Sequence, residues 1–478
     1  MPRDQLFLGF DFSTQQIKAV ITNDKLQTVH TEHVDFQQEL PQFNTDRGVH
    51  KHADGVTVTS PVQMWLRAFD LLLQKLKNNS NTDLSAVKAV SGAGQQHGSV
   101  YWAFEAEERL KHLNPDKTLA DQLSDCFAIH DSPIWMDSST TEQCAQLEMA
   151  VGGAQALADI TGSRAFHRFT GAQIAKIHQQ RSADYDKTER ISLVSSFGCS
   201  LLLGTYAPID WSDSSGMNLL SIHNHKWDDT LLSRCAPNLA KKLGETKPSD
   251  TALGKINNYY CERYGFSPDC IVVAFTGDNP ASLAGLNVQA GDLAVSWGTS
   301  DTVFVWLQEA KPSLNMHIFC NPVSRDEYMG LLCFKNGAFT RDRIRRECNC
   351  NDWDEFNELL FQTQPGNNGN IGFYYDFPEI LPNVSAGVHR FDSNDKKVAK
   401  FERAVEARAV IEHQCLAKRV HAEAAGYSTG GRVLVTGGAS KNHSILQILA
   451  DVFNSNVHVL NVANSAALGS AFRAKHGA

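Results

Sequence analysis

This chain of 478 residues lacks the sequence features that mark several large classes of protein. No apolar run approaches the roughly 18 residues of a membrane-spanning segment, and no basic stretch followed by an apolar one marks a secretion signal at its start. It also lacks an excess of positive charge, because 44 Lys and Arg face 53 Asp and Glu, a formal net charge of −9. That balance gives no electrostatic reason to expect nucleic acid or an anionic membrane as a partner, and we expect neither.

The 11 cysteines form no recognisable framework. They are scattered along the chain, Cys348 and Cys350 are the only close pair, and no Cys-x-x-Cys occurs. An even number of regularly spaced cysteines is typical of disulfide-bonded secreted domains, and that pattern is missing here. We therefore predict reduced thiols and a cytoplasmic protein.

Length and composition indicate a globular protein with more than one domain. Hydrophobic residues make up 42% and charged residues 20%, which is ordinary for a globular chain. A chain this long exceeds what one hydrophobic core supports, which favours two or three domains. The turn signal Ser267-Pro268-Asp269 directly precedes an apolar strand, so we place a boundary there, between a domain of residues 1–266 and one of residues 267–478.

Two distant stretches carry the same pattern. In residues 8–16 an apolar strand runs into Asp-x-Ser-Thr, and in residues 293–302 a second apolar strand runs into Gly-Thr-Ser. Each predicts a β-hairpin whose turn presents backbone N–H groups and hydroxyls to an anion, beside a carboxylate that can hold a cation. One such turn is ordinary, because Ser, Thr and Gly are common turn residues. Two of them, each opening one half of the chain, predict a duplicated nucleotide-binding core with a triphosphate held between the halves.

Several other segments have clear periodicity. Residues 61–76 place their apolar side chains on one face, and Pro61 suits the first turn of a helix, so we predict a helix there. Residues 87–92 predict a buried strand, followed by a polar loop over residues 94–98. In the second half we predict a helix over residues 403–424, a strand over residues 432–436 and a helix over residues 442–453.

The segment of residues 271–280 is an apolar strand that ends at Asp278-Asn279-Pro280, where Pro280 favours the start of a helix. Asp278 or Asn279 can be a simple helix cap. Alternatively, a carboxylate at a helix N-terminus is stabilised as the anion, so Asp278 should be ionised at neutral pH. It then suits a base that orients a hydroxyl nucleophile and accepts its proton during phosphoryl transfer.

Four further groups can bind ligands or can have purely structural roles. The turn at Gly437-Gly438 lies between a strand and a helix, where glycine allows close approach of a ligand. His97 in the loop of residues 94–98 can bind hydroxyls, although a lone histidine is often structural. The segment of residues 135–137 supplies a carboxylate and Arg168 a guanidinium, and each can equally form a surface ion pair.

Taken together and in this order, these motifs resemble the FGGY carbohydrate kinases, a family within the larger fold group of actin, hexokinase and the heat-shock chaperone ATPases. The resemblance covers essentially the whole chain, and only the combination of motifs is specific. The motifs are DFSTQQ (residues 11–16), SGAGQQHG (91–98), WMDSSTT (135–141), GDNPAS (277–282) and TGGAS (436–440).

The resemblance implies an α/β fold of two ribonuclease-H-like domains, each a sheet flanked by helices, with the active site in the interdomain cleft. It also implies a reaction, the transfer of the γ-phosphate of ATP to D-xylulose, which gives D-xylulose 5-phosphate and ADP. Its substrates would be a ketose sugar and ATP, and its cofactor Mg²⁺.

The resemblance also implies residue roles. Asp278 would be the catalytic base, and Asp11 would hold Mg²⁺ through water. The ketose would contact His97, Arg168, Asp278 and Asn279. The nucleotide would contact Ser13, Thr14, Gln15, Gly298, Thr299, Trp353, Gly438, Ala439 and Asn442.

Two residues depart from the family pattern, and other functions stay open. Gln96 stands where bacterial members usually carry Met, and Trp297 where a smaller aliphatic residue is common. A kinase for another ketose or polyol, such as ribulose or glycerol, is the nearest alternative, and a sugar-binding protein without turnover is a second. An assembly-type ATPase of the actin or chaperone kind is disfavoured by the polar loop around His97 and by the Asp278-Asn279 pair.

Overall fold

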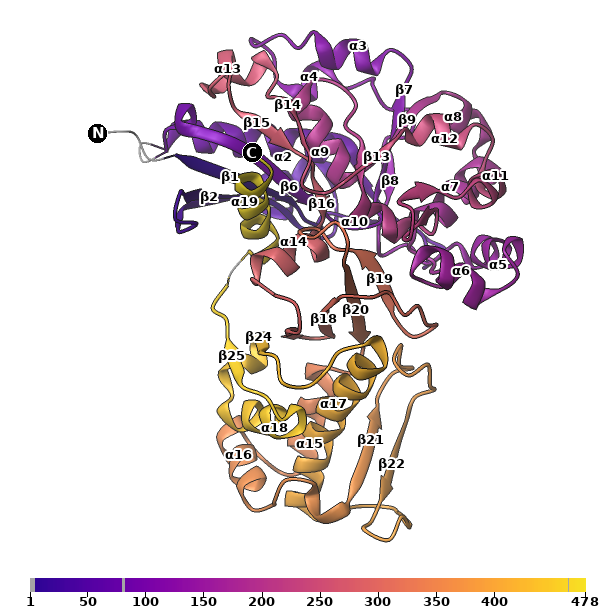
Figure 1. Cartoon of the computed structure of the whole chain (residues 1–478), viewed down its shortest axis with the longest axis vertical. Coiled ribbons are helices and arrows are strands. Elements are labelled where there is room, and N and C mark those ends of the chain that lie inside the picture. The colour runs from indigo at the N-terminus through magenta and orange to yellow at the C-terminus, as the bar shows by residue number, and fades with distance from the viewer. Residues whose placement is uncertain (1–4, 80–81, 463) are drawn as a thin grey trace. The chain divides into compact units, whose positions relative to one another are not determined.

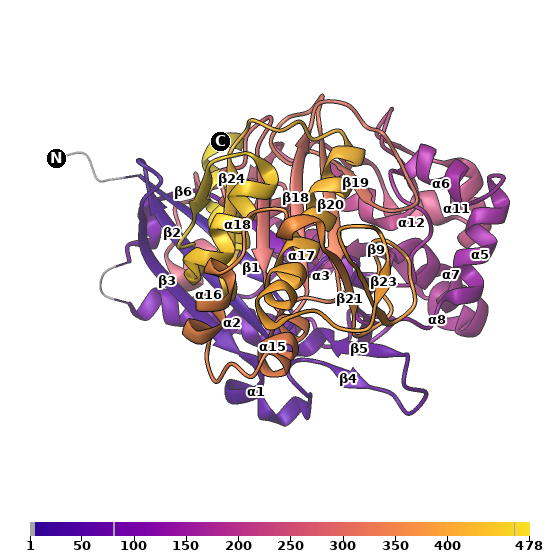
Figure 2. The same ribbon diagram turned by 90° about the horizontal axis from the view of Figure 1, so that it is seen from below.

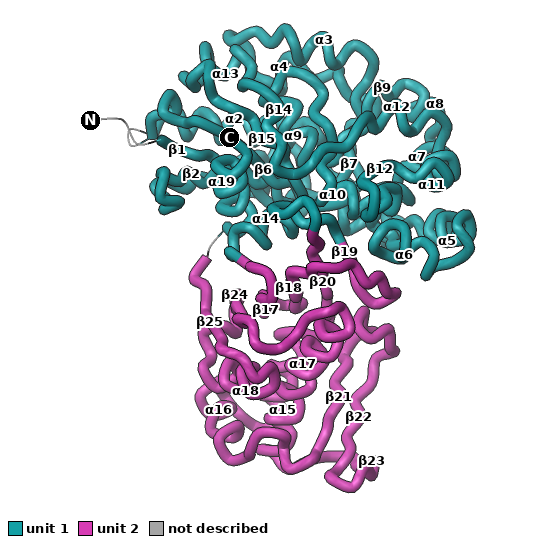
Figure 3. Tube along the Cα trace, viewed as in Figure 1, with its two compact units in different colours: residues 1–287, 319–326, 463–478 teal, residues 288–318, 327–462 magenta. Residues whose placement is uncertain are grey.

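The computed structural model describes residues 5–79, 82–462 and 464–478, which form two compact units. Figure 1 labels the elements, and Figure 3 colours unit 1 (residues 1–287, 319–326 and 463–478) and unit 2 (residues 288–318 and 327–462). The predicted boundary between residues 266 and 267 differs from this division. The turn at 267–269 precedes β15 (Ile271–Val273), which pairs with β6 (Val87–Gly94) in the sheet of unit 1.

Unit 1 is built on a mixed sheet in the order β14-β15-β6-β1-β2-β3, with β16 also paired to β6. Three strands form an antiparallel meander, and β6 and β15 continue the sheet in parallel with β1. The bounds not yet given are β1 (Leu6–Phe12), β2 (Gln16–Asn23), β3 (Thr28–Asp35), β14 (Ala252–Lys255) and β16 (Thr276–Gly277).

Alternation along β1 decides which side chains meet which helices. Phe10 and Phe12 point into the main core, with aromatic side chains of α2 (Val62–Asn78) and α9 (Val194–Leu203). The opposite face is covered by α19 (Ser465–Gly477), drawn in yellow against the sheet in Figure 1. Gly9 is required there, because a Cβ on it would lie 2.0 Å from the Ala467 carbonyl oxygen. The same alternation places Asp11 on the face covered by α19.

Other helices complete unit 1. The helix α14 (Asp278–Gly285) packs against α19, so the last residues of the chain support the helix that begins at Asp278. A second buried cluster lies under the outer helices and β7 and β9. These elements are α5 (Thr141–Ala150), α6 (Ala154–Thr161), α7 (Thr170–Gln180), α11 (Asp229–Cys235), β7 (Ser99–Ala103) and β9 (Thr188–Leu193).

Unit 2 contains five strands of a six-stranded second sheet, in the order β20-β18-β17-β24-β25. The first three strands are antiparallel, and β24 and β25 continue in parallel. Figure 2 shows α17 in front of this sheet, where it contacts β18 and β20. The strands are β17 (Leu293–Trp297), β18 (Asp301–Leu307), β20 (Tyr328–Phe334), β24 (Val433–Gly437) and β25 (Val457–Val459). The helices are α15 (Ala338–Glu347), α16 (Trp353–Phe361), α17 (Arg403–Ala425) and α18 (His443–Phe453).

The two sheets therefore share one plan, three antiparallel strands followed by two parallel ones, which is the ribonuclease-H-like arrangement that the resemblance implies. Both predicted hairpins form, one from β1 and β2 and the other from β17 and β18. The predicted helices over residues 61–76, 403–424 and 442–453 are confirmed to within two residues at their ends. In the described residues, none of the helices combines the length and the apolar character that a membrane crossing needs.

Candidate active site

Asp11, one residue before the end of β1, has one carboxylate oxygen that is hydrogen-bonded and one that is not. Its Oδ2 accepts a hydrogen bond from the Ser13 hydroxyl and lies 3.6 Å from Lys18 Nζ. Its Oδ1 is buried and has no hydrogen-bond partner among the described residues. Burial raises the pKa of Asp11, and Lys18 opposes that shift. An unsatisfied buried oxygen is costly unless a ligand meets it, so this atom marks a candidate binding site.

A cavity of about 250 Å³ in unit 1 brings Asp11 together with Asp278. It is lined by Asp11, Lys18, Asp278, Asn279, Ser282, Asn464, Ser465 and Ala466. The first residues of α14 and α19 thus meet at one pocket that contains two carboxylates. Five of these residues were not predicted as site residues, and they are Lys18, Ser282, Asn464, Ser465 and Ala466. The last three lie at the start of α19, which reaches the site only through tertiary packing.

Asp278 is the first residue of α14, and Gly277 before it is the N-cap, so the simple cap interpretation does not describe it. Its Oδ1 accepts hydrogen bonds from the backbone N–H of Gln96 (3.3 Å) and of Asn279 (2.9 Å). Burial raises the pKa of Asp278 to about 7, and the nearby charge of Asp11 adds to the shift. The prediction that Asp278 is ionised at neutral pH is therefore only partly met, because desolvation and a like charge outweigh the helix N-terminus and bring the pKa close to neutral pH.

Gln96 links this pocket to a buried acid that the sequence analysis did not identify. Its Oε1 accepts a hydrogen bond from Asn279 Nδ2 (2.9 Å), and its Nε2 donates to Asp213 Oδ1 (3.5 Å). Asp213 also accepts a hydrogen bond from the Ser195 hydroxyl (2.5 Å). Burial and the neighbouring Asp210 raise the pKa of Asp213 well above its usual value. The amide of Gln96 thereby fixes the orientation of Asn279.

His97 packs against Phe169, the residue that follows Arg168. The His97 ring stacks on Phe169 at 4.5 Å, and its Nδ1 lies 2.9 Å from the carbonyl oxygen of Gly216. The guanidinium of Arg168 lies over Phe166 at 4.5 Å. Arg168 Nε is buried and has no hydrogen-bond partner in the part of the chain that is described. His97 and Arg168 therefore lie in two loops that meet at Phe169, whereas Asp278 and Asn279 begin α14, and only these last two line the cavity of 250 Å³.

The predicted phosphate turn of unit 1 is held by side-chain contacts. Ser13 donates to Asp11, as described above, and Thr14 accepts a hydrogen bond from Trp135 Nε1 (2.9 Å). Gln15 is exposed. The Asp137 carboxylate is used structurally, because it accepts hydrogen bonds from the backbone N–H of Val58 (3.0 Å) and the Gln173 amide (2.7 Å).

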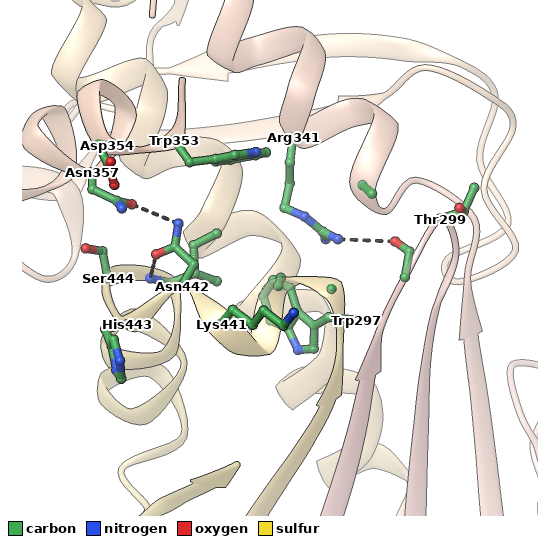
Figure 4. A pocket seen from close by; sticks show the side chains of 15 residues that line it. Trp297, Thr299, Arg341, Trp353, Asp354, Asn357, Lys441, Asn442, His443 and Ser444 are labelled. Atoms are coloured by element: carbon green, nitrogen blue, oxygen red, sulfur yellow. Dashed lines mark hydrogen bonds between the residues drawn. The ribbon is translucent and has the colours of Figure 1, made fainter. Parts of the chain in front are cut away.

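Unit 2 contains a larger cavity of about 550 Å³, seen from close by in Figure 4. The volume is in the range of small-molecule sites. Six predicted nucleotide-binding residues line it together, and they are Gly298, Thr299, Trp353, Gly438, Ala439 and Asn442. The other lining residues are Trp297, Ala338, Arg341, Asp354, Asn357, Lys441, His443, Ser444 and Ile445.

Two local structures shape this cavity. Asn442 caps α18 by accepting from the Ile445 N–H (3.1 Å), and its Nδ2 donates to Asn357 Oδ1 (2.9 Å) across the pocket. Gly437 has a φ of +89° and lies against the strand beside it, so that a Cβ would meet the Trp297 carbonyl oxygen at 2.2 Å. Only glycine fits this bend, which leads directly into the predicted binding turn.

The second turn differs from the first in how its acid is paired. Asp301 is fully buried and forms ion pairs with Arg341 (3.0 Å) and Lys418 (2.8 Å). Its Oδ1 also accepts the backbone N–H of Gly298 at 3.1 Å. That N–H is thus already used inside the protein, and the role of Gly298 in binding phosphate stays a prediction. Arg341 and Lys418 were missed because they lie in helices far along the chain.

Comparison with known proteins gives a consistent result. The sequence pattern of the N-terminal domain of the FGGY family of carbohydrate kinases matches residues 125–285, and that of the C-terminal domain matches residues 293–478. The chain is 55% identical over 472 residues to a Rattus norvegicus protein named xylulose kinase, which covers 98% of this chain and 88% of that protein. It is 47% identical over 491 residues to xylulose kinase 2 of Arabidopsis thaliana, which covers 100% of this chain and 88% of that protein.

A solved structure with a similar fold is that of xylulose kinase from Rhodospirillum rubrum, with a TM-score of 0.82. The match covers 98% of this chain and 89% of the bacterial one. Because the two sequences are only 15% identical, this likeness concerns the fold alone.

Proposed function

The chain belongs to the FGGY family of carbohydrate kinases, and on that premise we propose that it transfers the γ-phosphate of ATP to D-xylulose, giving D-xylulose 5-phosphate and ADP. The observation that carries this choice of sugar is the 55% identity, over 98% of the chain, to the rat protein named xylulose kinase. The neighbouring carboxylates of Asp11 and Asp278 in one pocket support the chemistry.

Asp278 is the proposed base. Hydrogen bonds from Gln96 and Asn279 orient its carboxyl through Oδ1, and the other oxygen would accept the proton of the sugar hydroxyl. That hydroxyl oxygen forms the new bond to the γ-phosphorus while the bond between this phosphorus and the ADP oxygen breaks. A pKa near 7 suits the task, because a base is most effective when its pKa lies close to the working pH.

Asp11 is the residue that fits Mg²⁺. Its Oδ1 is a hard oxygen ligand, buried and without a partner among the described residues, and Asp11 lines the same pocket as Asp278. Mg²⁺ keeps several waters and needs few protein ligands, so one carboxylate acting through water is sufficient. When bound, the ion would neutralise charge on the nucleotide phosphates.

We also propose that ATP binds in the cavity of unit 2. The exposed indole of Trp353 offers a face for the adenine, and the turn at Gly438 and Ala439 allows close approach of the nucleoside. In unit 1, His97, Arg168 and Asn279 would bind sugar hydroxyls. A polar pocket that pairs every hydroxyl rejects analogues that leave its own groups unpaired, by roughly a thousandfold or more.

The test is a coupled assay of ADP release across D-xylulose, D-ribulose, D-fructose and glycerol. We expect D-xylulose to give the highest kcat/KM. A clear preference for another sugar would keep the family and overturn the proposed substrate. Binding of D-xylulose by calorimetry without any sugar-stimulated ADP release would instead identify a binding protein without turnover.

A further inference from the structure

A buried charge cluster lies beside the second turn, in unit 2. Asp301 accepts contacts from Arg341 of α15 and Lys418 of α17, and all three side chains are at most 3% exposed. Within the described part of the chain, Asp301 is the only carboxylate that pairs with either cation. Two buried cations therefore share one anion, which leaves the cluster with one positive charge in excess.

The cluster fixes the turn itself. Asp301 accepts the N–H of Gly298, while Arg341 Nη2 donates to the Gly298 carbonyl oxygen (3.2 Å), the contact drawn in Figure 4. The N–H of Ala338 donates to the same carbonyl oxygen (2.9 Å). Both backbone groups of Gly298 are thus held, and the hydroxyl-bearing residues after it are left to face a ligand.

Trp297 connects the excess charge to the cavity. Both cations lie near its ring, the Arg341 guanidinium at 4.8 Å and Lys418 Nζ at 4.6 Å from the ring centroid, and Trp297 lines the cavity of unit 2. Its indole Nε1 is buried and has no hydrogen-bond partner among the residues described. The aromatic faces lessen the cost of burying the cations but carry no net charge. An N–H donor in need of an acceptor and an uncompensated positive charge both suit an anion.

The simpler interpretation is that the cluster only ties α15 and α17 to the sheet. Such a link uses one cation from each helix, but the second buried cation has no carboxylate of its own among the described residues and adds a desolvation penalty that the protein must offset. Negative charge bound in the adjacent cavity would offset it. The charge count thus favours a role toward a ligand over a purely structural one.

We propose that Asp301, Arg341 and Lys418 are positioning residues that hold the turn of residues 298–300 and make the cavity of unit 2 select a nucleoside polyphosphate over the nucleoside. The proposal rests on the proposed function, in which ATP is a substrate. Lys418 is 1% exposed, so it acts through Asp301 and through its charge and not by touching the ligand.

The test compares the affinities of the full chain for ATP and for adenosine by calorimetry, in the same Mg²⁺-free buffer. Lys418→Met keeps an unbranched side chain that is one atom shorter and removes the charge. We expect ATP to bind on the order of tenfold more weakly while adenosine binding changes little, because a unit charge acts strongly at low dielectric. Equal losses for both ligands, or no loss for either, would overturn the proposal.

Arg408→Met is the matched control. Arg408 lies on the same helix, is also buried, and pairs with Glu412 away from the turn. Arg408→Met should leave the ratio of the ATP and adenosine affinities unchanged. If Arg408→Met lowered this ratio as much as Lys418→Met does, the assignment to Lys418 would be overturned. If Lys418→Met does not fold by circular dichroism, Lys418→Gln replaces it with the same expectation, and Lys418→Arg should restore the ratio.

The assay of D-xylulose phosphorylation keeps the two proposals separate. If the wild-type chain phosphorylates D-xylulose but the ratio of its ATP and adenosine affinities does not depend on Lys418, the proposed function is retained and the proposal about the cluster is rejected. If the preference for ATP depends on Lys418 but the wild-type chain does not phosphorylate D-xylulose, only the proposed sugar is rejected.

Discussion

The hairpins that open the two units have the same backbone plan and use their acids in opposite ways. In unit 1, Asp11 precedes the turn, lies 3.6 Å from a single lysine and keeps one buried oxygen without a partner in the described residues. In unit 2, Asp301 follows the turn and is held by two cations and a backbone N–H.

This difference indicates that Asp11 is available to bind a ligand, whereas Asp301 stabilises the fold. A buried carboxylate whose pKa is raised by burial is poorly satisfied in the folded chain alone, which is typical of a group that awaits a ligand. A carboxylate with every contact filled by the protein has little left to offer a ligand. The two turns therefore share a backbone plan, whereas their acids differ in how far the protein itself satisfies them.

The largest effect is expected at Asp278, which shares the pocket of Asp11. Asp278→Asn should fold normally, still bind D-xylulose, and lose about a hundredfold to ten-thousandfold in kcat, the usual range for removal of a general base. Steady-state kinetics and calorimetry measure the two properties. Asp269→Asn, an exposed acid paired with Lys255, is the control and should keep full activity. Near-normal turnover of Asp278→Asn would remove this residue from the mechanism.

Asp301 should show the complementary behaviour, a loss of stability. Asp301→Asn leaves Arg341 and Lys418 buried without a counter-charge, and breaking a buried ion pair in this way costs about 3–5 kcal/mol in the free energy of unfolding. Urea denaturation measures the change. A loss below about 1 kcal/mol, the scale of exposed ion pairs, would contradict the view that the cluster is structurally essential.

The pH dependence of stability tests whether the pocket of unit 1 contains a carboxyl group with a raised pKa. The pKa of Asp278 rises from 3.8 to about 7 on folding, so between these values the folded chain retains a proton that the unfolded chain has lost. Stability should therefore fall as the pH rises from about 4 to about 7, and Asp278→Asn should remove that part of the fall. Melting temperatures of both proteins, measured across this range without Mg²⁺, test the sign. Parallel curves would show that Asp278 has an ordinary pKa.

The smallest effect is expected at His97. His97→Ala should raise the KM for the sugar several-fold and leave the KM for ATP nearly unchanged, because one hydrogen bond to a neutral hydroxyl is worth roughly 0.5–1.5 kcal/mol. Initial rates at varied concentrations of each substrate give both constants. Equal changes in the two would favour a purely structural role through the stacking on Phe169 and the contact with Gly216.

Much of the fold could be predicted from the sequence because its signals are local. The alternation in residues 8–16 and 293–302 and the helical periodicity of residues 61–76 depend only on near neighbours in the chain. The division into units could not be predicted in the same way. The helix α19 belongs to unit 1 because Gly9 admits its backbone against β1, and no local pattern reveals that contact.

The candidate site shows the same limit. The six predicted nucleotide-binding residues that line the cavity of unit 2 came from turn motifs and the resemblance to the family, and they do lie together. The raised pKa of Asp278 was not predicted because it depends first on burial and then on the nearby charge of Asp11, and both arise only from the tertiary fold. The link from Gln96 to Asp213 and the cations around Asp301 escaped notice for the same reason.

The most direct test compares Asp11→Asn with Asp301→Asn. For each variant it measures kcat per folded molecule, the Mg²⁺ concentration that gives half-maximal activity, and the free energy of unfolding. We predict that Asp11→Asn lowers kcat by on the order of a hundredfold, the scale for losing an electrostatic stabiliser, and raises the Mg²⁺ requirement without loss of stability. Asp301→Asn should do the reverse, with a large loss of stability and an unchanged Mg²⁺ requirement. If Asp11→Asn were as unstable as Asp301→Asn while its folded fraction kept full turnover, the two acids would have the same role and the account would be contradicted.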